Sequence, residues 1–291
     1  MKFHADCVPC LISGALKKID CVRDEGLRLE FLRGICRIIA AVDPEHDSAP
    51  LVDARIIALK RDLLGLEDDY TQVKHSFNNL MLSLYAQLKA QVEASEDPLR
   101  MAIQLSMAGN YIDFGVLGNV EAADALDMLE QAAEKPVDEA EYARLKQDLE
   151  GEGELIFLHD NCGEVVLDRL LLETIHSRYP RKKLVSVVRG GPILNDATIG
   201  DAREAGLAEV AEVVENGLTD IAGTQLDMLP EAVRLRLERS GMIIAKGQGN
   251  FETLTGCGLN VYYLFLSKCA SYTQWFGFER FSGILKNDLR M

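Results

Sequence analysis

The sequence predicts a helical N-terminal half packed on a C-terminal α/β domain with a Rossmann-like parallel sheet. Two observations support this fold class. Apolar residues recur at spacings of three and four through residues 1–148, as they do in amphipathic helices. From residue 149 onward, short apolar runs alternate with helical patterns, which is typical of parallel strands joined by crossover helices. We therefore expect a helical domain at 1–148 and an α/β domain at 149–291.

The N-terminal half contains no candidate strand. Proline-bearing or polar breaks at 43–44, 95–98 and 135–136 separate its helices. Two apolar stripes mark the sides that we expect to be buried. They comprise Leu27, Phe31, Leu32, Ile35, Ile38 and Ile39, and Val73, Phe77, Leu80, Met81, Leu84 and Leu88.

The C-terminal half contains five candidate strands, at 155–158, 184–188, 212–214, 242–245 and 262–266. The first four run into turns rich in Asp, Asn and Gly, with Lys246 at the end of the fourth. Because the carboxyl ends of parallel strands meet at one edge, where ligands bind, we expect these side chains to share one rim of the sheet.

Composition narrows the range of functions. The 291 residues, 48% of them hydrophobic, are enough for two ordinary cores. A net charge of −15 repels a phosphate backbone and argues against a nucleic-acid partner. No apolar run approaches the roughly 18 residues of a membrane helix, and no signal segment is visible, so we expect a cytoplasmic protein without a membrane partner. Seven cysteines, an odd number, favour reduced thiols.

The turns after the first two strands carry Asp160-Asn161 and Asn195-Asp196. Carboxylate and amide oxygens are hard ligands that suit Mg²⁺ or Mn²⁺. Loops also favour these residue types for their own hydrogen bonds, so turn formation alone is the alternative for any single pair. Four such turns at successive strand ends weaken that alternative.

The turn after the fourth strand suits an anionic group. Lys246 can meet a phosphoryl group as a compact cation, and residues 247–250 can present backbone N–H groups at the start of a helix. Glu164 and Asp168 share one face of the helix that follows Asp160. Glu164 either favours the positive end of that helix or orients the Asn161 amide or a bound water.

Three further motifs stand in the N-terminal half. Cys7 and Cys10 have the spacing of a redox pair or half a zinc site, although a structural role is the stronger interpretation without a second such pair. The segment 109–115, with Asn110 and Asp113, is either a helix-ending loop or part of a site between the domains. Asp69-Tyr70, Lys74 and Asn78, at helical spacing, would alone be a solvated face.

Taken in order, these motifs resemble one family. The motifs are Asp6-Cys-Val-Pro-Cys10, Asp69-Tyr70 with Lys74 and Asn78, Gly109-Asn110 with Asp113 and Gly115, Asp160-Asn161-Cys-Gly-Glu164, Arg189-Gly-Gly-Pro with Asn195-Asp196, and Lys246-Gly-Gln-Gly-Asn250. They are similar to those of the metal-dependent damage-control phosphatases, which were first catalogued as domain of unknown function 89. The chain resembles the subgroup with an N-terminal C-x-x-C, over nearly its whole length.

The resemblance implies hydrolysis of phosphate esters on small or damaged metabolites with a divalent metal. It implies that Asp160, Asn161 and Asp196 bind the metal, that Lys246 contacts the phosphoryl group, and that Asn110 and Asp113 face the same pocket. The residues expected to contact substrate are Asn110, Asp113, Glu164, Asn195, Gly247, Gln248 and Asn250.

Our hypothesis is a metal-dependent phosphatase that acts on small phosphorylated metabolites such as sugar phosphates or nucleotides, with Mg²⁺, Mn²⁺, Co²⁺ or Ni²⁺. Direct attack by water and a covalent phosphate on Asp160 both fit the sequence. The alternatives are a non-catalytic phosphate- or nucleotide-binding module, and a thiol redox or metal-handling protein that uses Cys7 and Cys10. A dinucleotide oxidoreductase is disfavoured because no G-x-G-x-x-G follows the first strand. The sequence does not indicate an oligomeric state.

Overall fold

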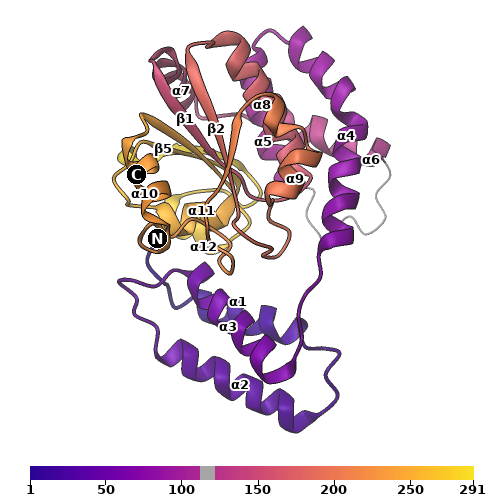
Figure 1. Ribbon diagram of the computed structural model, residues 1–291, viewed down its shortest axis with the longest axis vertical. Helices are drawn as coiled ribbons and strands as arrows, with labels where there is room; N and C mark the ends of the chain where they lie inside the picture. Colours follow the sequence, from indigo (N-terminus) through magenta and orange to yellow (C-terminus); the bar gives the residue numbers. More distant parts are fainter. Residues whose placement is uncertain (112–121) are drawn as a thin grey trace.

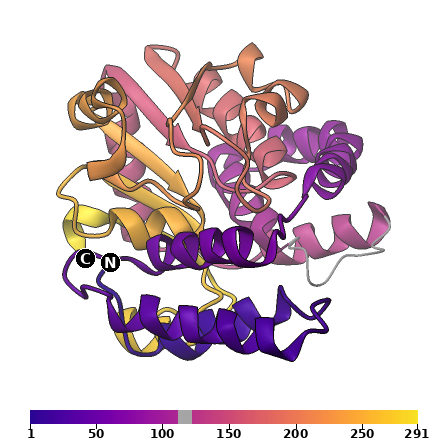
Figure 2. The ribbon, with the colours of Figure 1, turned by 60° about the horizontal axis from the view of Figure 1, so that its bottom comes forward.

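The structure is a computed structural model that describes residues 1–111 and 122–291. Its first three helices, α1 (Cys7–Lys17), α2 (Glu25–Ala40) and α3 (Ala49–Leu64), form a lobe below the rest of the molecule, with α3 nearer the sheet than α2 (Figures 1 and 2). This lobe has its own apolar cluster, made by Ala15, Ile19, Phe31, Ile35, Val52 and Ile56. Leu27, expected on the buried stripe of α2, is instead 38% exposed.

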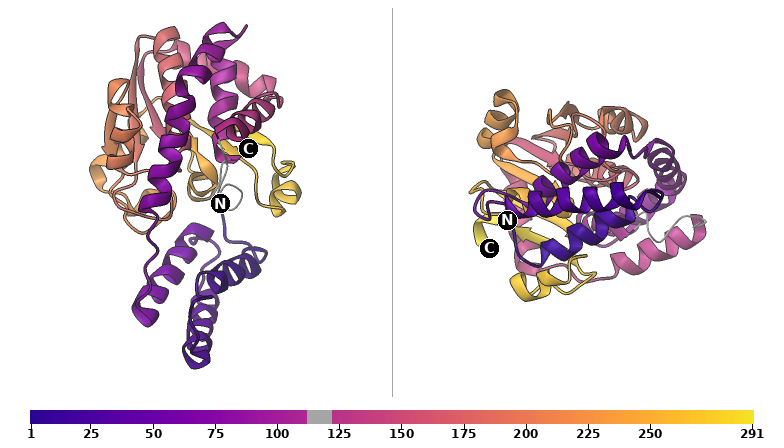
Figure 3. Two further views of the ribbon diagram at one scale, coloured as in Figure 1. Left: turned by 90° about the vertical axis from the view of Figure 1, so that its right-hand side faces the viewer. Right: turned by 90° about the horizontal axis from the view of Figure 1, so that it is seen from below.

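The next helices pack on the sheet itself. They are α4 (Thr71–Ala94), α5 (Pro98–Ala108), α6 (Ala122–Ala133) and α7 (Glu139–Glu150), with a 3-10 turn at Gly109–Tyr111. The left view of Figure 3 shows α4 rising from the lobe along the body of the molecule. Apolar residues of these helices belong to the same cluster as one face of the sheet. The predicted boundary at residue 148 stays a prediction, and the shared core ties α4–α7 closely to the α/β part.

Local signals explain where these helices begin. Asp97 and Asp138 precede α5 and α7, and their carboxylates accept hydrogen bonds from backbone N–H groups of the first turn. Such caps satisfy donors that have no partner within the helix. Pro98 adds the fixed φ that suits a first helical position.

A six-stranded sheet in the order β3-β2-β1-β4-β5-β6 forms the centre of the molecule. Its strands are β1 (Gly153–Leu158), β2 (Lys182–Val188), β3 (Glu212–Glu215), β4 (Met242–Lys246), β5 (Val261–Leu266) and β6 (Gly283–Asn287). The five predicted strands are confirmed, and they pair in parallel. The sixth was not predicted and runs antiparallel to β5, so the expected all-parallel sheet is correct only for β1–β5.

Helices cover both faces of the sheet. Leu155 and Phe157 of β1 face the cluster shared with α4–α7 and with α8 (Glu164–Arg178), whereas Ile156 and Leu158 face the opposite cluster. This alternation is the period of a strand. The second face is covered by α10 (Glu231–Arg239), α11 (Gly247–Leu254) and α12 (Ser271–Phe276), and α9 (Ile199–Glu204) lies with the first. Further 3-10 turns span Leu207–Glu209, Leu226–Met228 and Asp288–Arg290.

The strand order reverses at β1, which has β2 on one side and β4 on the other. In open parallel sheets, the crevice beyond the carboxyl ends at such a reversal is where ligands bind. The lobe faces this edge of the sheet. A cavity of about 280 Å³ lies between them, lined by Lys60 of α3 and by Tyr70 just before α4 on one side, and by Pro192 and Leu194 beyond β2 on the other. Within the described ranges, no helix has the length and apolar character needed to span a bilayer.

Candidate active site

The structure brings the two predicted acid-bearing turns together. Asp160 and Asn161 follow β1, and Asp196 lies in the loop that follows β2. The Ala197 N–H donates to the Asp160 carbonyl at 2.7 Å, and the Cys162 N–H donates to the Asn195 carbonyl at 2.9 Å. Asn161 and Asp196 pair as an isolated antiparallel bridge. Backbone hydrogen bonds therefore fix the two turns to each other.

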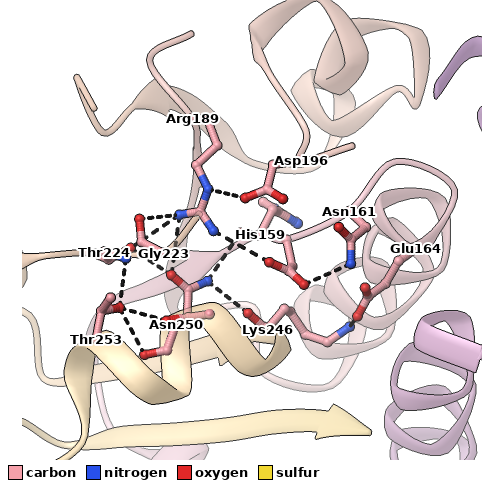
Figure 4. Close-up of polar contacts among 12 residues, drawn as sticks. His159, Asn161, Glu164, Arg189, Asp196, Gly223, Thr224, Lys246, Asn250 and Thr253 are labelled. Carbon is pink, nitrogen blue, oxygen red and sulfur yellow. Dashed lines mark hydrogen bonds and ion pairs between the residues drawn. The ribbon is translucent and has the colours of Figure 1, made fainter. Parts of the chain in front are cut away.

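Arg189, at the end of β2, joins the two carboxylates and was not assigned a role from the sequence. Its side chain is 2% exposed. Nε donates to Asp196 at 2.6 Å (Figure 4). NH2 lies 3.5 Å from Asp160 Oδ1. NH1 donates to the Gly223 carbonyl at 2.8 Å and to Asn250 Oδ1 at 3.3 Å. A planar guanidinium can hold several oxygens at once, which explains an arginine here.

Gly247 lies against Asp160. It has a φ of +79°, and a Cβ at this position would lie 1.9 Å from Asp160 Oδ2. The same carboxylate oxygen accepts from Asn161 Nδ2 at 2.8 Å. The glycine is therefore required both by the turn and by the close approach of the carboxylate.

A second buried cluster lies beneath the rim. Lys246 is fully buried, and its ammonium contacts Glu164, Asp168 Oδ1 at 2.7 Å and the Ser106 carbonyl at 2.9 Å. Asp168 also accepts from Ser106 Oγ at 2.7 Å, and its Oδ2 lies 2.9 Å from His159 Nδ1. With three acceptors around its ammonium, Lys246 is arranged to hold Glu164 and Asp168. Its predicted phosphoryl contact stays a prediction.

Burial and charge act on these groups in different directions. Burial, together with Asp196 and Glu164, raises the pKa of Asp160 well above its usual range, while Arg189 and Lys268 oppose that rise. Burial likewise raises the pKa of Asp196 against the effect of Arg189. Burial also acts to raise the pKa of Asp168, but Lys246 and His159 outweigh it and the pKa is lowered. Burial lowers the pKa of His159, which favours a neutral imidazole.

The charges in this region do not balance. Four buried carboxylates are held by two buried cationic side chains, so two negative charges are uncompensated when all four acids are ionised. The acids are Asp160, Glu164, Asp168 and Asp196, and the cations are Arg189 and Lys246. Buried charges without partners are costly. A divalent cation would supply the missing charge.

The residues at the rim fit such a cation. Asp160, Asn161 and Asp196 offer two carboxylates and an amide, all hard oxygen donors. In residues 1–111 and 122–291, no three His, Cys, Asp or Glu side chains are arranged to hold a metal. That finding and the proposed set are compatible, because the set contains only two acids and its third member is an amide.

The other predicted site residues are placed as follows. Asn110 donates to Glu164 Oε2 at 2.9 Å, so the helical side does reach this cluster. Asn250 is fully buried and donates to the carbonyls of Lys246 and His159, which gives it a structural position beneath the rim. Asp113 lies outside the described residues.

Gln248 and Asn195 lie at the rim and are partly exposed. Gln248 Nε2 donates to Glu252 at 3.0 Å. Its Oε1 is buried with no hydrogen-bond partner among the described residues. Lys268, which was not predicted as a site residue, follows β5 on the same rim, and its charge acts on Asp160. Its position just after the fifth predicted strand was the available signal.

Cys7 and Cys10 lie at the start of α1 with free thiols. Partial burial raises the pKa of both thiols, which lowers their thiolate fraction at neutral pH. This environment disfavours a reactive redox pair. A functional role for the pair stays a prediction.

Comparison with known proteins gives the family. The family model described as the damage-control phosphatase ARMT1-like domain matches residues 3–282. The chain belongs to the damage-control phosphatase family. It is 33% identical over 276 residues to a damage-control phosphatase of Archaeoglobus fulgidus, covering 92% of this chain and 93% of the relative. It is 25% identical to the damage-control phosphatase PH1575 of Pyrococcus horikoshii, covering 92% of each chain.

A solved structure supports the fold. The crystal structure of the DUF89 family protein PH1575 from Pyrococcus horikoshii matches with a TM-score of 0.85 and 23% identity, covering 99% of each chain. At this identity, the likeness concerns the fold alone. Membership of the family agrees with the resemblance inferred from the motifs, and the narrower assignment to the subgroup with an N-terminal C-x-x-C stays a prediction.

Proposed function

We propose that this damage-control phosphatase hydrolyses phosphate monoesters of small metabolites, with a divalent cation held by Asp160, Asn161 and Asp196. The observation that carries the proposal is the set of four buried carboxylates at the strand reversal, which contact only two buried cationic side chains, Arg189 and Lys246. When bound, the cation would polarise phosphoryl oxygens and lower the pKa of a water.

The chain's own residues prepare this site. Arg189 contacts the carboxylates of both Asp196 and Asp160 and so holds them in a fixed relation to each other. Backbone N–H groups at the start of α11 are suited to receive negative charge from a transferring phosphoryl group. Lys268 is partly exposed at the rim, whereas Lys246 is fully buried, so we assign the contact with the phosphoryl group first to Lys268.

Two routes for the attacking group share this arrangement. Either a water attacks phosphorus in line, or Asp160 forms a covalent phosphate that water then hydrolyses. A single turnover in ¹⁸O-labelled water, together with chemical trapping of any phosphorylated aspartate, separates them. Direct attack by water places the label in phosphate, leaves Asp160 unlabelled and gives no trapped intermediate. On the covalent route, attack of water at the carbonyl carbon of the acyl phosphate would label the Asp160 carboxylate. Attack of water at phosphorus would place the label in phosphate, and this case is recognised by trapping the phosphorylated aspartate.

The test of the proposal is a panel of sugar and nucleotide monophosphates assayed with Mg²⁺, Mn²⁺, Co²⁺ or Ni²⁺. We expect release of phosphate that is abolished by a chelator, restored by at least one of these ions, and lost in Asp160→Ala. The matched control is Cys7→Ser with Cys10→Ser, which should keep the activity. Turnover that needs no metal, or that survives Asp160→Ala, would contradict the proposal. The expected cytoplasmic location stays a prediction.

A further inference from the structure

We infer that Lys74 and Asn78, one turn apart on α4, are positioning residues that hold the two acid-bearing turns in place for cation binding. The inference rests on the proposed function, and it gives a role to two residues that the sequence alone would leave on a solvated face. Both are buried, with Lys74 7% and Asn78 0% exposed. Residues four apart on a helix lie on the same side, so both side chains point toward the same part of the sheet rim.

Asn78 acts on the turn that carries Asp160 and Asn161. Its Oδ1 accepts a hydrogen bond of 2.7 Å from the Gly163 N–H. Gly163 has a φ of +79°, and a Cβ there would lie 3.1 Å from the Cβ of Phe77. Helix α4 is therefore pressed directly against this turn. A neutral amide satisfies the buried N–H without adding another negative charge beside the buried carboxylates of the site.

Lys74 acts on the loop that carries Asp196. Its ammonium lies 2.6 Å from Asp201 Oδ2. The same oxygen accepts from the Thr198 N–H at 2.8 Å and from Thr198 Oγ1 at 2.6 Å, which completes the capping box of α9. Thr198 is two residues from Asp196, so Lys74 fixes the end of that loop through a single carboxylate.

Asn78 also ties the two contacts into one unit. Its Nδ2 donates to Glu204 Oε2 at 2.8 Å, and Glu204, like Asp201, belongs to α9. A single helix of 24 residues thus contacts the Asp160 turn directly and reaches the Asp196 loop through α9. Asp160 and Asp196 repel each other when ionised, and that repulsion would separate turns that are held loosely. The contacts of Lys74 and Asn78 keep the carboxylate oxygens of Asp160 and Asp196 close together. The two turns then lose less conformational freedom when the cation binds.

The experiment measures Mn²⁺ affinity by calorimetric titration and folding stability by urea unfolding, on the full chain. Asn78→Leu removes both hydrogen bonds of the amide at similar volume. We expect its Mn²⁺ dissociation constant to rise about 10- to 100-fold, as is typical when an outer partner of a metal ligand is lost. The matched control is Asn79→Leu, the same substitution at the next position of α4, where the side chain is exposed. This variant should bind Mn²⁺ within about threefold of wild type, well below the rise expected for Asn78→Leu.

If Asn78→Leu does not fold, Lys74→Met provides the same test on the other turn, again with Mn²⁺ affinity as the measurement. A purely structural role predicts lower stability with an unchanged dissociation constant for the folded protein, and that result would overturn the inference. Failure of the proposed function looks different: wild type itself would bind no Mn²⁺, or Asp160→Ala would bind it as tightly as wild type does.

Discussion

Gly247→Ala tests most sharply how the fold shapes the proposed cation site. An alanine Cβ would lie 1.9 Å from Asp160 Oδ2 and 2.1 Å from its Cγ. Non-bonded carbon atoms ordinarily pack at about 3.5–4.0 Å, so the carboxylate must move by more than an ångström or the turn must open. The substitution also places an L-residue at a φ of +79°, which costs about 1–2 kcal/mol.

The two costs can be separated by a matched control. Gly258 has a φ of +77°, and a Cβ there meets nothing within 4 Å. Gly258→Ala should therefore lose only the backbone term of about 1–2 kcal/mol in urea unfolding and keep its activity. Gly247→Ala should lose that amount plus about 1–3 kcal/mol for overpacking.

Activity should fall sharply in only one of the two variants. A displacement of about 1 Å at a reacting group can cost on the order of 100-fold in rate, or about 2.7 kcal/mol of barrier. We expect kcat/KM of Gly247→Ala for a monophosphate substrate with Mn²⁺ to fall at least that far, and that of Gly258→Ala to stay near wild type. Equal effects of the two substitutions on stability and kcat/KM would refute this account of Gly247.

Two further predictions concern charge. Lys246→Met leaves Glu164 and Asp168 without their buried cation, so the free energy of unfolding in urea should fall by about 3–5 kcal/mol at pH 7, and a loss below about 1 kcal/mol would contradict the burial of this cluster. Hydrogen bonds from Arg236 lower the pKa of Glu212 from 4.5 to about 2. A lowered pKa in the folded state stabilises the fold at pH values above the pKa of the unfolded state. Glu212→Gln should therefore be less stable than wild type above about pH 5, and this difference should vanish as the pH falls toward 2. A difference that does not depend on pH would show that the ion pair is not its cause.

Strands β1–β5 could be predicted because each contains a short apolar run, and the first four are followed by turns of Asp, Asn, Gly or Lys. Both signals are local. The rule that parallel strands end at one edge then placed Asp160 near Asp196 without any knowledge of side-chain contacts. β6 was missed because its residues, Gly283–Asn287, become a strand only by pairing with β5 at the sheet edge. Similarly, Val73 has the spacing of a buried stripe but is 36% exposed, because packing decides which side of a helix is covered.

The contacts of single side chains could not be read from the sequence. Lys246 was predicted at the rim, but its ammonium reaches the Ser106 carbonyl, 140 positions earlier in the chain. Arg189 was visible in a motif, yet its position between Asp160 and Asp196 depends on how two loops fold back on each other. Asn78 shows the same limit, since its partner Gly163 lies 85 positions away. Such pairings depend on tertiary packing rather than on local pattern.

The most direct test of the central claim is diffraction from crystals grown with Mn²⁺, recorded at the manganese absorption edge. We expect an anomalous peak within coordination distance of oxygens from Asp160, Asn161 and Asp196, and no such peak in crystals of Asp160→Ala. A peak at other residues, with these three side chains left unbound at saturating Mn²⁺, would contradict it.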